Sequence, residues 1–162
     1  GVLYDKQKTI LIQAPGGLNG EYSIPSSVTN IGTYAFYNCD SLTGILISPN
    51  VTKIEEYAFE NCDNLTNIVI PPGVSSIEAY TFQGCSNLIT VEIPDGITKI
   101  RPEAFSNCNN LTNIEIPSSV TKKKEKAFYN CPNLDIVIDN SEYSIMVETD
   151  AFKGCKSVSW KK

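Results

Sequence analysis

Apolar side chains recur along this chain at a fixed interval of 23 residues. Four residue types keep this step over five copies: Ile24, Ile47, Ile70, Ile93 and Ile116; Phe36, Phe59, Phe82, Phe105 and Phe128; Cys39, Cys62, Cys85, Cys108 and Cys131; and Leu42, Leu65, Leu88, Leu111 and Leu134. Phe152 and Cys155 continue their rows after a step of 24. Chance does not align four residue types over five copies, so the chain consists of internal repeats.

Each copy carries a strand pattern. In the copy that spans residues 47–69, the motif NLTNIVI places apolar side chains at Leu65, Ile68 and Ile70, which is the L-x-x-L-x-L pattern of a leucine-rich repeat. The last two alternate with polar or small residues, as expected for a short strand with one buried side. Proline and glycine then end the strand and turn the chain, as at Pro71 and Gly73.

A second segment of each copy favours a short helix or 3₁₀ turn. The motif EEYAFEN is acidic at its start and has Tyr57, Ala58 and Phe59 in its middle. Pro102 near the start of the matching segment RPEAFSN supports this interpretation, because proline is tolerated in the first helical turn. A copy of this length cannot bury its own apolar face, so successive copies must stack.

The stacked copies predict a single α/β repeat domain over residues 1–162. It is a right-handed leucine-rich-repeat solenoid of 23-residue repeats, with a parallel sheet on one side and short helical or 3₁₀ segments on the other. Helices are bulkier than strands, which lie about 4.8 Å apart, so we expect a concave sheet and a convex helical side. Residues 18–138 form the regular repeats, residues 1–17 an N-terminal hairpin cap, and residues 139–162 a degenerate last repeat and C-terminal cap.

The repeat motif I-P-x-x-V-T-x-I-x-x-x-A-F-x-N-C-x-x-L-T-x-I-x resembles the BspA-like class of leucine-rich repeats. The resemblance covers about residues 18–158 and is especially strong at residues 93–115 and 116–134. BspA-like proteins are typically surface or secreted proteins of host-associated bacteria and of some parasitic protists, and several are implicated in adhesion. The resemblance therefore implies an extracellular or cell-surface protein that binds a protein ligand, with host extracellular proteins and glycans as candidates.

Composition argues against several kinds of chemistry. The chain has no histidine, which removes imidazole bases and His-ligated metal sites. The net charge is −5, and residues 1–121 carry 5 basic against 12 acidic side chains, which argues against a nucleic-acid partner. No apolar run approaches the ~20 residues of a membrane helix, and no signal-peptide pattern is present. We expect no catalytic residue, cofactor, metal or membrane insertion, and either a monomer or part of a longer chain.

Both ends depart from the repeat. Residues 2–4 and 10–12 predict two strands around a polar turn, a hairpin that covers the first repeat. Lys123 stands where other copies have isoleucine, so either this copy is frayed outward or the lysine stem runs along the core with its head in water. Trp160 is expected to close the last repeat, with a disordered tail as the alternative.

Three repeated positions suggest chemistry but favour a structural role. The six cysteines occur once per copy, and the curvature of the predicted convex side would separate them beyond the Cβ distance of about 3.8 Å that a disulfide needs. We expect reduced thiols in a core row, with disulfides and a reactive nucleophile as alternatives. Asp40, Asp63 and Asp135 suggest calcium, but the matching positions elsewhere carry other residues. The asparagines before the cysteines are expected to satisfy backbone groups where each helical segment ends, rather than to bind glycans; they are Asn38, Asn61, Asn107 and Asn130.

The outward positions of the predicted strands form the candidate binding surface. Its residues are Thr43, Leu46, Thr66, Asn67, Val69, Ile89, Thr90, Glu92, Thr112, Asn113 and Glu115. In the fifth strand the register is open, with Asp135, Ile136 and Ile138 as candidates. This surface changes from small and apolar to acidic along the axis, which favours binding of a protein partner. A structural spacer within a larger surface protein is the second hypothesis, and an enzyme is the third.

Overall fold

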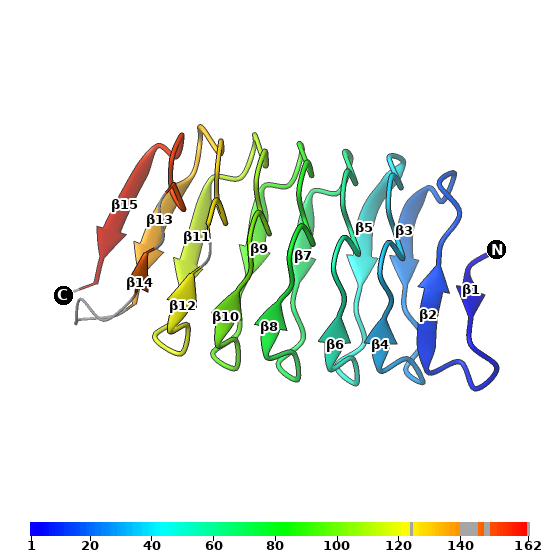
Figure 1. Ribbon diagram of the computed structural model, residues 1–162. Coiled ribbons are helices and arrows are strands. Elements are labelled where there is room, and N and C mark those ends of the chain that lie inside the picture. Colours follow the sequence, from blue (N-terminus) through cyan, green and yellow to red (C-terminus); the bar gives the residue numbers. More distant parts are fainter. Residues whose placement is uncertain (124, 140–145, 148–149, 162) are drawn as a thin grey trace.

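The chain forms a solenoid of about six turns, or coils, in which two rows of strands run side by side along the molecule (Figure 1). The computed structural model describes residues 1–123, 125–139, 146–147 and 150–161, and the side chains of these residues apart from 122–123 and 146–147. The two termini lie at opposite ends of the stack (Figure 1).

One row of strands forms a surface that we call the sheet face. Its strands are parallel and pair in the orders β3-β5 and β7-β9-β11-β13-β15. They are β3 (Gly20–Ser23), β5 (Leu42–Leu46), β7 (Asn67–Val69), β9 (Thr90–Glu92), β11 (Asn113–Ile116), β13 (Asp135–Ile138) and β15 (Ser157–Trp160). Ile68 and Val91 are buried at the centres of β7 and β9, between exposed neighbours, which confirms the predicted alternation of inward and outward side chains.

A second row of shorter strands forms what we call the back face. These strands pair in the orders β1-β2-β4-β6 and β8-β10-β12-β14. They are β1 (Leu3–Tyr4), β2 (Ile10–Gln13), β4 (Asn30–Ile31), β6 (Lys53–Ile54), β8 (Ser76–Ile77), β10 (Lys99–Ile100), β12 (Lys122–Lys123) and β14 (Met146–Val147). A turn segment then links each back-face strand to the next sheet-face strand. These segments together form the turn face.

The expected helical or 3₁₀ segments are wrong: the described residues contain no helix, and residues 56–61 form successive turns. Backbone N–H groups here alternate between two kinds of partner. Those of Ala58 and Glu60 donate to carbonyls three residues back, whereas those of Tyr57, Phe59 and Asn61 donate to carbonyls of the next coil, at 2.8–3.2 Å. Tyr57 and Asn61 have positive φ, at 59° and 55°, which a right-handed helix does not allow.

Because the turn face has turns where helices were expected, the reason for expecting a strongly concave sheet no longer holds. That expectation required helices bulkier than strands on the far side. The stacked phenylalanine rings of the turn face instead lie 5.0–5.5 Å apart between successive coils, close to the about 4.8 Å between neighbouring strands. The two sides of the stack therefore advance by nearly equal steps.

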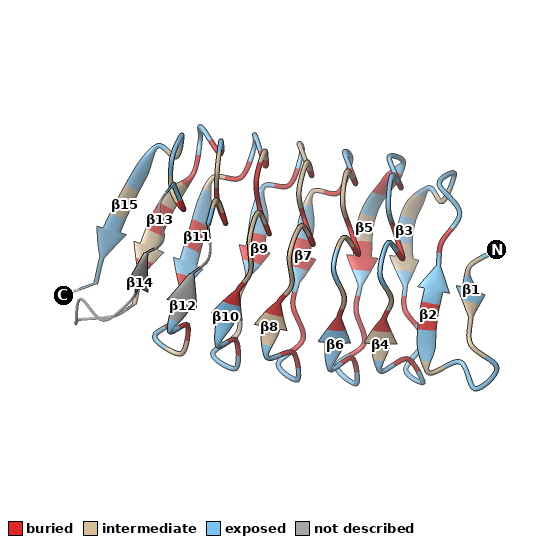
Figure 2. Cartoon of the chain, in the orientation of Figure 1, coloured by how far each residue is buried: buried red, intermediate tan, exposed pale blue. Residues whose placement is uncertain are grey.

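The core is a set of parallel columns that run through every coil. Phe36, Phe59, Phe82, Phe105 and Phe128 are fully buried, and each ring stacks on the next. Buried residues recur on the inner side of successive coils (Figure 2). All six cysteines are free thiols and five are buried, which confirms the predicted core row. The thiol of Cys62 donates to the carbonyl of Phe36 in the preceding coil at 3.1 Å, and Cys85 and Cys108 repeat this bond.

The asparagines that precede the cysteines bond one another rather than the backbone. Asn61 Nδ2 donates to Asn38 Oδ1 at 3.2 Å, and Asn130 Nδ2 donates to Asn107 Oδ1 at 2.8 Å. All four asparagines have φ between 54° and 60°. Because there is no helix end to cap, the predicted capping role is wrong. Asparagine suits these positions because it tolerates positive φ.

At the N-terminal end, β1 pairs antiparallel with β2, and β2 continues in parallel with β4. The hairpin therefore extends the back face, and its role as a cap stays a prediction. At the other end, Trp160 is 53% exposed, so the expectation that it closes the last repeat is wrong. Val158 packs against the core in its place. The backbone of Lys123 pairs with Ile100 and Val147, but its side chain, and with it the question of its burial, lies outside the described residues.

Candidate functional site

The sheet face presents three rows of exposed side chains. Two rows come from alternate residues of the strands, which point away from the core, and the other lies where the strands start. The first row holds Thr43, Thr66, Ile89 and Thr112; the second holds Gly44, Asn67, Thr90 and Asn113; the third holds Leu46, Val69, Glu92 and Glu115. All the residues predicted for this surface in the first four strands are at least partly exposed on it. Their role in binding stays a prediction.

The pairing of β13, the strand of the fifth copy, settles the register that the sequence left open. Asn113 pairs with Asp135 and Glu115 with Val137, so Asp135 and Val137 point outward. Ile136 and Ile138 are fully buried, and their placement on the surface is wrong. The reason is a missing residue: the motif LTNIEI of the fourth copy corresponds to LDIVI in the fifth.

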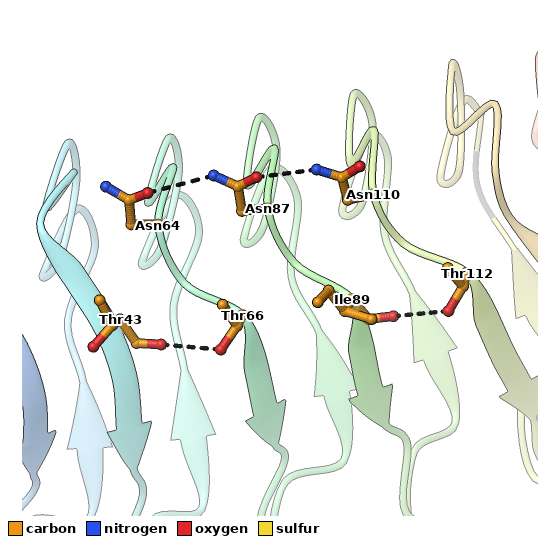
Figure 3. A pocket seen from close by; sticks show the side chains of 7 residues that line it. All are labelled: Thr43, Asn64, Thr66, Asn87, Ile89, Asn110 and Thr112. Atoms are coloured by element: carbon orange, nitrogen blue, oxygen red, sulfur yellow. Dashed lines mark hydrogen bonds between the residues drawn. The ribbon is translucent and has the colours of Figure 1, made fainter.

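A shallow groove of about 470 Å³ follows the first row, between the strand starts and the loops that precede them (Figure 3). It is lined by Thr43, Thr66, Ile89 and Thr112 on one side and by Asn64, Asn87 and Asn110 on the other. The hydroxyls of Thr66 and Thr112 donate to backbone carbonyls of the neighbouring coil, at 3.2 Å and 3.4 Å. These donors are therefore already engaged, and the groove offers methyl groups and amides to a ligand.

The asparagines of the groove form a ladder. Asn87 donates to Asn64 Oδ1 at 3.4 Å and Asn110 to Asn87 Oδ1 at 3.0 Å (Figure 3). Asn64 itself donates to the backbone carbonyl of Asp40 at 2.7 Å. The surface predicted from the sequence does not include this ladder. A signal for it exists, since an Asn-Leu pair recurs four times at the 23-residue step, ahead of β7, β9, β11 and β13.

Large apolar side chains stand exposed in the first half of the sheet face. Leu46 is 69% exposed, Val69 56% and Ile89 46%. Leu46 also lines a second hollow of about 390 Å³ with Tyr22 and Asn67. Scattered apolar residues are ordinary on protein surfaces, whereas several on adjoining strands mark an interaction surface.

The second half of the sheet face is acidic. A hollow of about 230 Å³ is lined by Glu92, Asp95 and Glu115 together with apolar residues. Lys161 forms an ion pair with Glu115, and both side chains are largely exposed. Among the described residues, Glu92 and Asp95 have no such partner. Asp95 is absent from the predicted surface because it lies in the turn that follows the strand.

At the far end of this face the charges are compensated. Asp135 accepts hydrogen bonds from Lys156 Nζ and Ser157 Oγ, both at 2.6 Å. These bonds, the one from Lys156 first, lower the pKa of the Asp135 carboxyl. Glu92 and Asp95, which line the same hollow, have no ion-pair partner among the described residues.

The thiols at the two ends of the cysteine column are poor nucleophiles. Burial raises the pKa of Cys39 to about 12 and that of Cys155 to about 12, and nucleophilic chemistry needs the thiolate. Within the described part of the chain, no group of three or more acidic or cysteine side chains is placed to hold a metal ion. No helix long and apolar enough to cross a membrane occurs among the same residues.

Six copies of the BspA-type leucine-rich-repeat region match residues 20–135. The chain belongs to the BspA-type leucine-rich-repeat family. Its repeats account for the sheet face, and leucine-rich-repeat proteins generally mediate protein interactions rather than catalysis. None of the functionally curated protein sequences matches the chain significantly.

Solved structures of bacterial leucine-rich repeat proteins share the fold of this BspA-type chain. One from Eubacterium ventriosum has a TM-score of 0.80 and 27% identity, over 96% of this chain and 48% of its own. One from Bacteroides ovatus has a TM-score of 0.70 and 28% identity, over 93% and 43%. The leucine-rich repeat protein of T. pallidum has a TM-score of 0.70 and 25% identity, over 93% and 71%. The chain spans about half the length of the first two.

Proposed function

We propose that this chain is a non-enzymatic interaction module, extracellular or at a cell surface, that binds a protein partner through its sheet face. The observation that carries the proposal is the exposure of Leu46, Val69 and Ile89 on one ordered sheet. Beside them lie the carboxylates of Glu92 and Asp95, which have no ion-pair partner in the described part of the chain. Apolar surface gives favourable burial, and an adjacent charged region gives specificity and a faster approach of the partner. The family resemblance names host extracellular proteins and glycans as the first ligands to test.

A structural spacer is the alternative function. It is supported by the lengths of the solved relatives, of which this chain spans about half. A spacer uses its stack of coils to hold other modules apart and makes no specific use of the sheet face.

A binding screen separates the two functions. The purified chain is tested against extracellular-matrix proteins and glycans beside the variant Val69→Lys/Glu92→Lys. The variant Thr52→Lys/Glu56→Lys is the matched control, because it adds the same charge at exposed positions outside the sheet face. A binder loses affinity in the first variant and keeps it in the control. Equal binding by both variants, or no binding by any of the three proteins, sinks the sheet-face proposal and favours the spacer.

A further inference from the structure

Leu46, Val69, Glu92 and Glu115 occupy the same outward position of four successive strands, β5, β7, β9 and β11. We call this row the lane. It crosses the strands and runs along the axis of the stack. Its first two members are apolar and 69% and 56% exposed. Its last two are acidic and line the hollow that also contains Asp95.

The carboxylates of the lane are available to a partner. Glu92 has no ion-pair partner among the described residues, and Glu115 meets only Lys161. That pair is exposed on both sides, and exposed ion pairs contribute little stability. A cation from a partner can therefore replace Lys161 at small cost, and Glu92 and Asp95 give it further negative charge.

The spacing of the lane selects the backbone form of a ligand that lies along it. Neighbouring strands lie about 4.8 Å apart, so the four lane positions fall at about 0, 4.8, 9.6 and 14.4 Å. On one face of an α-helix, residues i, i+3, i+7 and i+10 fall at about 0, 4.5, 10.5 and 15 Å. An extended chain places same-side residues about 6.8 Å apart, at about 0, 6.8 and 13.6 Å, so it meets the two ends of the lane and misses both middle positions.

We propose that the lane binds an amphipathic α-helix of the partner protein, with apolar residues at i and i+3 over Leu46 and Val69 and Lys or Arg at i+7 and i+10 over Glu92 and Glu115. This inference rests on the proposed function and names the chemistry of its partner. The apolar half supplies buried area. The charged half fixes the direction in which the helix lies, because reversal would place its cations over Leu46 and Val69.

The probe is a synthetic helix of about 16 residues, held helical by a lactam bridge on its outer face, because free helices of this length are marginal. It carries Leu at i and i+3 and Lys at i+7 and i+10. A second helix has the same composition with the lysines moved to i+5 and i+9, which turns them off the contact face. A third carries Glu in place of Lys. A fourth peptide, kept extended by proline, presents the same side chains at alternate positions.

We expect the first helix to bind the chain and the Glu92→Gln/Glu115→Gln variant to bind it about tenfold more weakly. Affinity falls with rising salt in the parent and hardly changes in this variant. The variant Glu92→Lys/Glu115→Lys instead prefers the Glu-bearing helix, and this exchange of preference is the decisive readout. Circular dichroism and thermal unfolding show that each variant is folded, as expected for changes at exposed positions.

Three outcomes overturn the inference: no binding of the first helix at about 1 mM, equal binding of the shifted helix, or tighter binding of the extended peptide. Each differs from failure of the proposed function. If the screen finds a partner whose binding depends on Val69 and Glu92, but the lane binds none of the helices, the helical ligand is rejected and the sheet-face proposal stands. A screen in which the Val69→Lys/Glu92→Lys variant behaves as the parent rejects both.

Discussion

The turn face and the sheet face of the same coils differ in how strictly they repeat. On the turn face the phenylalanine, cysteine and asparagine positions recur from coil to coil, and each contacts its own counterpart or the adjoining coil. On the sheet face one position carries leucine, valine and then glutamate. Side chains that contact the next coil are limited by that contact, whereas outward side chains are not. The columns therefore carry the stability of the stack, whereas the outward rows are free to vary, as the proposed binding surface requires.

The largest expected effect comes from the phenylalanine column. Phe82 is fully buried between the rings of Phe59 and Phe105, and Phe82→Ala is expected to destabilise the fold by about 3–5 kcal/mol. The sheet-face variant Val69→Lys/Glu92→Lys is expected to change stability by less than about 1 kcal/mol. Urea unfolding measures both. If the two variants cost the same, the division between columns and rows is wrong.

A smaller effect is expected at the gap in the asparagine column. Gly84 has a φ of 72°, and a Cβ built there lies 2.2 Å from Asn61 Oδ1. Gly84→Val is expected to cost about 2 kcal/mol, because a β-branched residue at positive φ is strained and the neighbour must move. Gly84→Asn supplies the residue that four other coils carry at this position, and it is expected to cost less than half as much. Thermal unfolding compares the two, and a valine variant as stable as the asparagine variant would contradict this account.

The stacked tyrosines of the turn face permit a finer test. Tyr57 has a φ of 59° and stacks on Tyr34 and Tyr80, with ring centroids 4.7 Å and 4.8 Å away. Lys126 holds the corresponding position with a φ of 57°. Because alanine retains the Cβ at both positions, backbone strain cancels, and Tyr57→Ala should cost about 1–2 kcal/mol more than Lys126→Ala. Equal unfolding free energies for the two variants would show that the exposed stack adds nothing.

The smallest effect is expected in the hairpin. Asp5 accepts hydrogen bonds from the backbone N–H groups of Ile10 and Thr9 at 2.7 Å, and these bonds, that of Ile10 first, lower the pKa of its carboxyl in the folded chain. This contribution is therefore present above the ordinary aspartate pKa of about 3.9 and is lost as the pH falls through the lower folded value. Thermal midpoints of the parent and of Asp5→Asn should differ slightly at pH 6 and converge in acid. If the two thermal midpoints move further apart in acid, the ionised Asp5 carboxylate does not stabilise the hairpin.

Much of the fold follows from the 23-residue period. It predicts the stacking, the alternation within each strand, and the buried columns of isoleucine, phenylalanine and leucine, because equivalent residues of stacked copies must meet. The outward set of the first four strands follows from the same alternation. The cysteine row is also predictable, since one thiol per coil at a constant position packs among other apolar side chains.

The turn segments and the last strand could not be derived in this way. The segment EEYAFEN has a helix-like composition, but its alternate N–H groups bond carbonyls about 22 residues away in the chain, and no local pattern reveals those partners. The outward position of Val137 depends on one missing residue in the fifth copy. Trp160 shares its register with the buried Ile138, but β15 is the last of the described sheet-face strands, so no following coil covers its side chain.

The equal spacing of the coils has a consequence for the growth of such a chain. Junctions between neighbouring coils share contacts, as where the thiols of Cys62, Cys85 and Cys108 each donate to a phenylalanine carbonyl of the preceding coil. Recombination within the gene that duplicates one 23-residue unit therefore inserts a coil that fits both of its neighbours. Each insertion lengthens the molecule by about 4.8 Å and adds a fresh set of outward side chains, so selection can enlarge and revise the surface without redesigning the interior.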